Sequence, residues 1–143
     1  MANKSERDTD RWVDGLLKDA GIELEAEKSS IREIQEALKT ASKKGTGKIG
    51  KPEYIGVVKD FIIVIEDKPT IDKHIKLDGT LISMETNAIV DYAVNGALFY
   101  AQHLANIHHI IKLLLLGYLG MKRNTELARY MLMIRNIIEN FQR

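Results

Sequence analysis

The chain contains no cysteine among its 143 residues. This absence excludes a disulfide framework, a thiolate zinc site and a cysteine nucleophile. There are only two prolines, and the longest apolar stretch, residues 110–121, is interrupted by Lys112 and is far shorter than the roughly 20 residues that span a bilayer. The N-terminus lacks the apolar core of a secretory signal. We therefore expect a cytoplasmic protein with no membrane partner.

The remaining composition is that of an ordinary soluble globular protein. Hydrophobic residues make up 45% of the chain and charged residues 29%. A chain of 143 residues corresponds to one domain, because domains cluster near roughly 100–150 residues. A two-domain enzyme is not expected.

The net charge of +1 conceals an uneven distribution of charge along the chain. Residues 37–52 include no acidic residue, whereas acidic residues outnumber basic ones between residues 53 and 106. A basic loop next to an acidic segment suits a site for a polyanion and a metal ion, because lysines neutralise phosphates while carboxylates hold the cation. On charge alone, a merely solvated lysine-rich loop is an equally good explanation. The lysines of this segment are Lys39, Lys43, Lys44, Lys48 and Lys51.

Apolar residues at helical spacing predict two helices near the N-terminus. The first covers residues 8–20, and the second begins at a capping box formed by Ser30 and Glu33 and continues to residue 41. Residues 43–51, KKGTGKIGK, contain three glycines and are expected to form a loop. The glycine spacing matches a dinucleotide-binding fingerprint, but such a site needs a strand before the loop and a helix after it. The predicted order here is the reverse, which argues against a nucleotide site.

The periodicity changes after residue 53. Residues 54–58 and 61–65 are β-branched and aromatic runs joined by Lys59 and Asp60, which predicts a β-hairpin. The second run, FIIVI, is apolar at every position, so we expect a central strand that is covered on both faces. A short strand near Leu81 and a helix over residues 91–105 follow. Helices, a central hairpin and a following helix together predict an α/β sandwich.

Two carboxylates and a lysine converge at one end of the predicted hairpin. Glu53 precedes the first strand, and Glu66 and Lys68 lie at the end of the second, so antiparallel pairing brings all three to the same end of the sheet. Glu53 and Glu66 offer the oxygen ligands that Mg²⁺ prefers, and Lys68 is placed to orient or deprotonate an attacking water. Asp67 is expected to point to the opposite face, with its backbone carbonyl as a further ligand.

Three segments, ASKKGTGKIGKPEYIG, FIIVIEDK and DYAVNGALFYAQHL, resemble the N-terminal nuclease domain of bacterial restriction enzymes that carry a DNA methyltransferase on the same chain, and of type I-like restriction subunits. These enzymes are members of the PD-(D/E)xK nuclease superfamily. The resemblance covers residues 31–105 and implies a restriction-endonuclease-like sandwich that cleaves DNA with Mg²⁺, within a restriction-modification enzyme whose methyltransferase part is absent from this chain. It implies Glu53 and Glu66 as metal ligands and Lys68 as the catalytic lysine.

Members of this superfamily often use a further glutamate from the preceding helix, and Glu33 and Glu36 compete for that role. Because the capping box already explains Glu33, Glu36 is the favoured catalytic residue. Many relatives also have a Gln-x-x-x-Tyr pair in the helix after the active-site strand. Asn95 and Tyr100 are about 140° apart on a helix, so they are not assigned to the site.

The lysine-rich loop is the predicted contact with DNA. A flexible loop that presents cationic and hydroxyl groups can hold the phosphate backbone without reading the bases. The residues expected to do so are Lys43, Lys44, Thr46, Lys48 and Lys51.

Residues 107–143 do not continue the resemblance. Relatives run on into a strand of alternating aromatic and small residues and then a Ser-Gly turn. Codons for HHIIKLLLLGYLGMKRNTELARYMLM can be chosen so that reading from one nucleotide earlier gives SYHKAFAFGVSGNEKKHRISPVYVD, the continuation that the resemblance requires. We infer that the coding frame shifted near Ile107. The expected organisation is a nuclease-like domain over residues 1–106 and an atypical helical tail over residues 107–143.

Two other functions remain open from the sequence. The first is a catalytically impaired DNA-binding remnant, in which the lysine-rich loop holds DNA but no cleavage follows. The second is a helical oligomerisation module built on the apolar tail, with a second copy of the chain as its partner in a homodimer. Divalent-dependent nicking of DNA distinguishes the first from a nuclease, and light scattering tests the second.

Overall fold

The computed structural model describes residues 6–59, 61–105 and 112–117. Helices and strands alternate along the chain, which confirms the predicted α/β class. In chain order the elements are α1 (Glu6–Asp19), β1 (Glu25–Ala26), α2 (Arg32–Lys39), β2 (Tyr54–Val58), β3 (Phe61–Glu66), a 3₁₀ turn (Ile71–Lys73), β4 (Leu77–Asp78), β5 (Leu81–Ile82), α3 (Thr86–Asp91), α4 (Ala93–Leu104) and β6 (Lys112–Gly117).

The main sheet has the strand order β1-β2-β3-β6. β2 and β3 form the predicted antiparallel hairpin, with a register that runs from Tyr54 opposite Ile65 to Val58 opposite Phe61. Lys59 adopts a positive φ of 57° at the turn, the left-handed conformation that short hairpin connections require. This register brings the beginning of β2 and the end of β3 to one end of the sheet.

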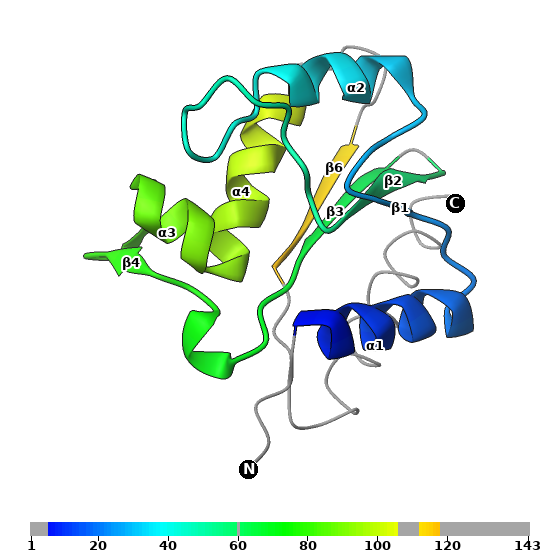
Figure 1. Cartoon of the computed structure of the whole chain (residues 1–143), viewed down its shortest axis with the longest axis horizontal. Coiled ribbons are helices and arrows are strands. Elements are labelled where there is room, and N and C mark those ends of the chain that lie inside the picture. The colour runs from blue at the N-terminus through cyan, green and yellow to red at the C-terminus, as the bar shows by residue number, and fades with distance from the viewer. Residues whose placement is uncertain (1–5, 60, 106–111, 118–143) are drawn as a thin grey trace.

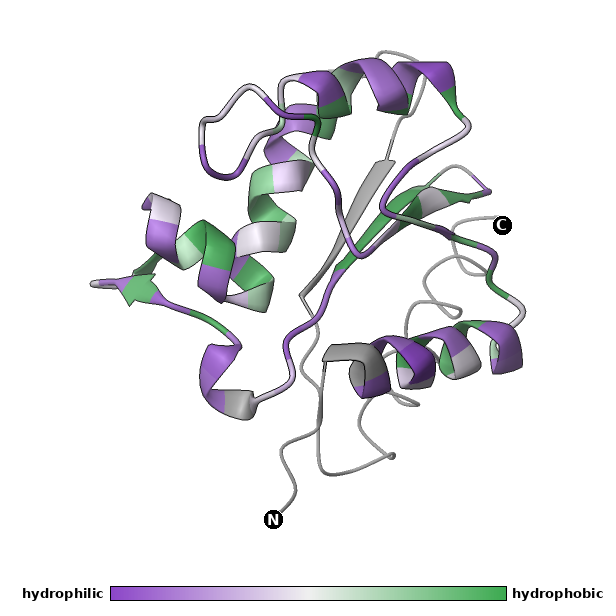
Figure 2. Ribbon diagram, viewed as in Figure 1, coloured by the Kyte–Doolittle hydropathy of each residue, from purple (hydrophilic) through white to green (hydrophobic). Residues whose placement is uncertain are grey.

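Helices cover both faces of the sheet. Figure 1 shows α1 on one side of β3, and α2 and α4 on the other. Phe61, Ile63 and Ile65 pack in a core with residues of α1, while the alternate residues Ile62 and Val64 pack with residues of α2 and α4. Every residue of β3 is buried, which confirms the prediction of a strand covered on both faces. Figure 2 shows β3 coloured as apolar along its length, and α1 and α2 with hydrophilic and apolar residues interspersed.

One local prediction on the helices is wrong. Ser30 does not cap α2, because its N–H and hydroxyl both donate to Glu25 Oε2, at 2.6 and 3.0 Å. The residue at the N-cap position of α2 is Ile31, and no side chain caps the helix there. The helix expected over residues 91–105 is confirmed as α4. The sequence did not predict the short helix α3 before it, which ends at the extended Tyr92 (φ −119°, ψ 136°). Asn95 then binds the backbone of Lys76 and Ser83, which fixes the β4–β5 hairpin against α4.

Within the predicted helical tail, Lys112–Gly117 forms a strand, β6. It pairs in parallel with β3, from Phe61 beside Lys112 to Glu66 beside Gly117. The physical reason is that the edge of β3 would otherwise expose a row of backbone N–H and C=O groups, so strand pairing is favoured there over a helix. The domain boundary at residue 106, the inferred frame change near Ile107 and the rest of the tail lie outside the described residues.

None of the helices in the described ranges is long and apolar enough to cross a membrane.

Candidate functional site

The end of the β2–β3 hairpin gathers acidic side chains from three segments. Glu66 is the last residue of β3, and Glu53 directly precedes β2. Because Tyr54 lies opposite Ile65, Glu53 comes next to Glu66, and the Glu53 N–H donates to Glu66 Oε1 at 3.3 Å. The hairpin thus brings together the two carboxylates that the sequence singled out.

Glu66 is held by a buried ion pair. Its side chain is only 1% exposed, and its Oε2 accepts a hydrogen bond from Lys43 Nζ, on a side chain that is 16% exposed. The same ammonium lies 4.9 Å from the centroid of the Tyr100 ring. Gly96 of α4 makes room for the pair, since a Cβ there would lie 2.9 Å from Lys43 Nζ and 3.1 Å from Glu66 Oε2. Lys43 therefore faces the interior instead of the solvent, where the sequence placed it among the DNA-binding lysines.

Replacing Lys43 by Met is expected to lower the free energy of unfolding by roughly 3–5 kcal/mol, because it leaves a buried carboxylate without its partner. The neighbouring Lys44 is exposed and provides the matched control. Its replacement by Met should change stability by no more than about 0.5 kcal/mol. Urea unfolding of both variants measures the difference, and equal midpoints would show that the ion pair contributes nothing to stability.

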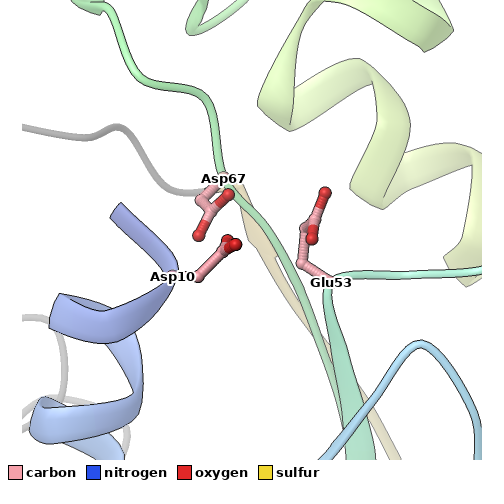
Figure 3. Close-up of side chains that lie close together, drawn as sticks. All are labelled: Asp10, Glu53 and Asp67. Atoms are coloured by element: carbon pink, nitrogen blue, oxygen red, sulfur yellow. The ribbon is translucent and has the colours of Figure 1, made fainter. Parts of the chain in front are cut away.

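A second group of carboxylates lies on the α1 side of Glu53. Asp10 of α1, Glu53 and Asp67 each offer an oxygen, and these oxygens all lie within 4.8 Å of one another. Figure 3 shows the three side chains gathered where β3 ends and β2 begins. Strand alternation turns Asp67 away from Glu66, as the sequence predicted. Its side chain thereby meets α1, so it offers a carboxylate and not just a backbone carbonyl.

These acids experience an excess of negative charge. Burial, and then the charge of Glu66, raise the pKa of Glu53 to about 7. Burial, and then the charges of Glu53 and Asp10, raise the pKa of Asp67 to about 8. Lys68 acts in the opposite direction on both groups, which places its positive charge near the two carboxylates. The site therefore favours the addition of positive charge, either as protons or as a cation.

The chemistry of these residues fits a hard divalent cation. All the candidate ligand atoms are carboxylate oxygens, the kind that Mg²⁺ and Ca²⁺ prefer. Asp67 is 4% exposed, and its Oδ2 has no hydrogen-bond partner in the described part of the chain. A buried carboxylate oxygen without a partner is costly, so a cation at this position would remove an unfavourable contribution to folding.

The lysine-rich loop between α2 and β2 is anchored at its base. Gly50 donates its N–H to Leu38 O at 2.8 Å, and Lys51 donates its N–H to the Tyr100 hydroxyl at 3.0 Å. A Cβ on Gly50 would lie 2.4 Å from Ala41 O, so only glycine fits there. Tyr100 thus positions the loop. The side chains that the anchored loop exposes include Lys44, Thr46, Lys48 and Lys51.

The predicted role of Glu36 is corrected by its position. The inward face of α2 carries Ile34 and Leu38, and Glu36 lies between them in sequence and so faces outward. Its carboxylate is 57% exposed and pairs with Lys39 at 2.7 Å, away from the other acids. The helix carboxylate that reaches the site is Asp10 of α1.

A signal for Asp10 was present in the sequence. Asp10, Val13 and Leu17 follow the spacing i, i+3, i+7, which places one acid on the apolar stripe of α1. An acidic residue on a buried stripe needs a partner, because burial of an unpaired charge is expensive.

No protein-family model matches the chain, and no solved structure matches it. The chain is similar to the type II restriction enzyme and methyltransferase RM.BcgI of Heyndrickxia coagulans, with 41% identity over 98 residues. The match covers 67% of this chain and 15% of that protein, so the chain spans a small part of the relative. This similarity relates the chain to a restriction-modification enzyme.

Proposed function

We propose that the chain is a nuclease part of a restriction-modification enzyme and that it hydrolyses DNA phosphodiester bonds with Mg²⁺. The observation that carries the proposal is the hydrogen bond from the Glu53 N–H to Glu66 at the end of one hairpin, with Lys68 two residues beyond the end of β3. The similarity to a restriction enzyme and methyltransferase supports the choice of DNA as substrate. The α/β sandwich is proposed to be of the restriction-endonuclease type.

Each site residue has a proposed role. Glu53 and Glu66 hold Mg²⁺, which when bound would polarise the phosphate and neutralise the charge that develops on its oxygens. Lys68, as an ammonium, orients the attacking water and neutralises the charge that develops on the phosphate, while the water gives its proton to solvent as the new oxygen–phosphorus bond forms. The bond to the leaving oxygen breaks on the opposite side of the phosphorus, and the leaving oxygen takes a proton from solvent.

A direct experiment tests this function. Supercoiled plasmid incubated with the chain should be nicked and linearised in MgCl₂ and should stay intact in EDTA. Salt-sensitive binding of DNA without any cleavage would support the DNA-binding remnant. Light scattering that shows dimers or larger species, with neither binding nor cleavage, would support the oligomerisation module.

The exposed residues of the loop are proposed to hold the DNA backbone. Replacing Lys44, Lys48 and Lys51 together by Gln should flatten the dependence of log affinity on log salt by roughly 0.9 for each phosphate that the loop no longer neutralises. Fluorescence anisotropy of a labelled duplex over a series of KCl concentrations measures the slope. Lys39 is a control, because it is exposed but pairs with Glu36 on α2. Slopes that are the same in the triple variant and in wild type would show that the loop is merely solvated.

A further inference from the structure

The two carboxylates next to Glu53 differ in how their charge is satisfied. Glu66 has protein donors at both oxygens, Lys43 Nζ at one and the Glu53 N–H at the other. Asp67 is equally buried, yet its Oδ2 has no donor within the described ranges. The buried carboxylate on the α1 side of Glu53 is therefore the one that a bound cation would satisfy.

We propose that Asp10, Glu53 and Asp67 form a divalent-cation site of their own on the α1 face of the sheet. It shares only Glu53 with the Glu53–Glu66 pair. The proposal adds a second ion site to the proposed Mg²⁺-dependent nuclease. Only a role of this ion in cleavage rests on that proposed function, because the ion can bind without DNA. The cation is a hard one, Mg²⁺ or Mn²⁺, because all three side-chain ligands are carboxylates.

The spacing of the three carboxylates fits one ion. Oxygens bound to the same Mg²⁺ or Ca²⁺ ion at its usual coordination distances lie roughly 3–5 Å apart. The three oxygens already lie within 4.8 Å of one another, so small rotations of the side chains suffice to close the site. Figure 3 shows that Asp10 on α1 and Asp67 after the end of β3 approach each other, with Glu53 beside them.

The position of Asp10 is fixed by the core. The hydroxyl of Tyr54, a residue of β2 that is 8% exposed, donates to Asp10 O at 2.9 Å. One and two turns further along α1, Val13 and Leu17 are buried against β3. The first turns of α1 are thus held against the end of the hairpin, and the site does not depend on a movable surface group.

The experiment removes the Glu66 ligand first, so that binding on the α1 side can be observed alone. The full chain is stripped with EDTA and titrated with MnCl₂ by calorimetry, and its melting temperature is followed with and without MgCl₂. Glu66→Gln alone should still bind one ion and melt higher in MgCl₂. Adding Asp10→Asn or Asp67→Asn to Glu66→Gln should weaken that binding by roughly tenfold or more.

Asp14→Asn in the same Glu66→Gln background is the matched control. Asp14 lies one turn beyond Asp10 on α1, but its carboxylate is 51% exposed and pairs with Lys18. This variant should bind as Glu66→Gln does. Glu66→Gln leaves Lys43 without its partner and is expected to lower stability, so the metal-free melting temperature and circular dichroism of each variant must show a folded chain before its binding is compared. The added Asn substitutions each remove a charge from an overcharged cluster and should not lower that melting temperature further.

The outcomes separate the two proposals. Loss of all ion binding in Glu66→Gln, or unchanged binding after Asp10→Asn and Asp67→Asn, would overturn the α1-side site, and cleavage of plasmid by wild type would still support the nuclease. Ion binding that follows the expected pattern, together with a wild-type chain that leaves plasmid intact in MgCl₂, would overturn the proposed function and support the site.

Discussion

Replacing Glu53 by Gln is expected to reduce Mg²⁺-dependent nicking of supercoiled plasmid by roughly 10²–10³-fold or more, the effect typical of losing one group that stabilises charge in a transition state. Glu53 belongs to both carboxylate groups at the end of the hairpin, so its loss removes a ligand from each. The fold should persist, because burial and the charge of Glu66 already raise the pKa of Glu53 to about 7 and a neutral side chain is tolerated there.

The measurement compares initial nicking rates on agarose gels, with circular dichroism as the check on folding. Lys68→Met should lose cleavage to a similar degree but keep its affinity for the ion, because Lys68 acts on the water and the phosphate. Glu36→Gln is the matched control, since Glu36 lies on the exposed face of α2 in a pair with Lys39. A folded Glu53→Gln variant that nicks plasmid at the wild-type rate would show that cleavage does not depend on this site.

The sequence predicted the parts of the fold that depend on local pattern. The run FIIVI is apolar at every position, and β3 is buried throughout because helices cover both of its faces. The two residues between the apolar runs predicted the hairpin, and the hairpin alone determines that Glu53 and Glu66 meet. The positions of Glu53 and Glu66 therefore follow from the strand register, because a two-residue turn allows few other registers.

The orientation of individual side chains could not be predicted from the sequence. Lys43 lies in a run of lysines and glycines, and composition gives its charge but not its orientation. Its orientation is decided by Gly96, which leaves room beside Glu66 for the ammonium. Asp10 is likewise one acid among several in the first predicted helix, and only the packing of α1 on the sheet places it beside Asp67. Both assignments depend on contacts between segments that are distant in the chain.

The strand β6 bears on the inferred change of reading frame. Codons for its sequence, KLLLLG, can be chosen so that reading one nucleotide earlier gives KAFAFG, with lysine and glycine retained at its ends. The register places its four leucine positions beside Ile62, Ile63, Val64 and Ile65 of β3. Both readings can form a strand at this edge, because both are apolar.

Restoring the frame, so that the segment after Ile107 reads SYHKAFAFGVSGNEKKHRISPVYVD, is expected to raise the melting temperature by roughly 3–10 °C. In the restored strand, the register places alanines beside Ile62 and Val64 of β3 and phenylalanines beside Ile63 and Ile65. A sequence selected for this edge of the sheet is expected to pack better than one that arose from a change of frame. Poorly fitting side chains in a packed sheet typically cost about 1–3 kcal/mol, and this sets the size of the expected gain.

Cleavage should rise together with stability, because β6 borders β3 at Glu66 and a better-packed strand holds that carboxylate more firmly. Calorimetric melting and plasmid nicking of the two chains, prepared side by side, measure both effects. The nucleotide sequence tests the inference independently. If its codons over residues 107–133, read one nucleotide earlier, contain stop codons or give no strand-turn-strand sequence, then the frame did not shift and KLLLLG was selected for this edge of the sheet.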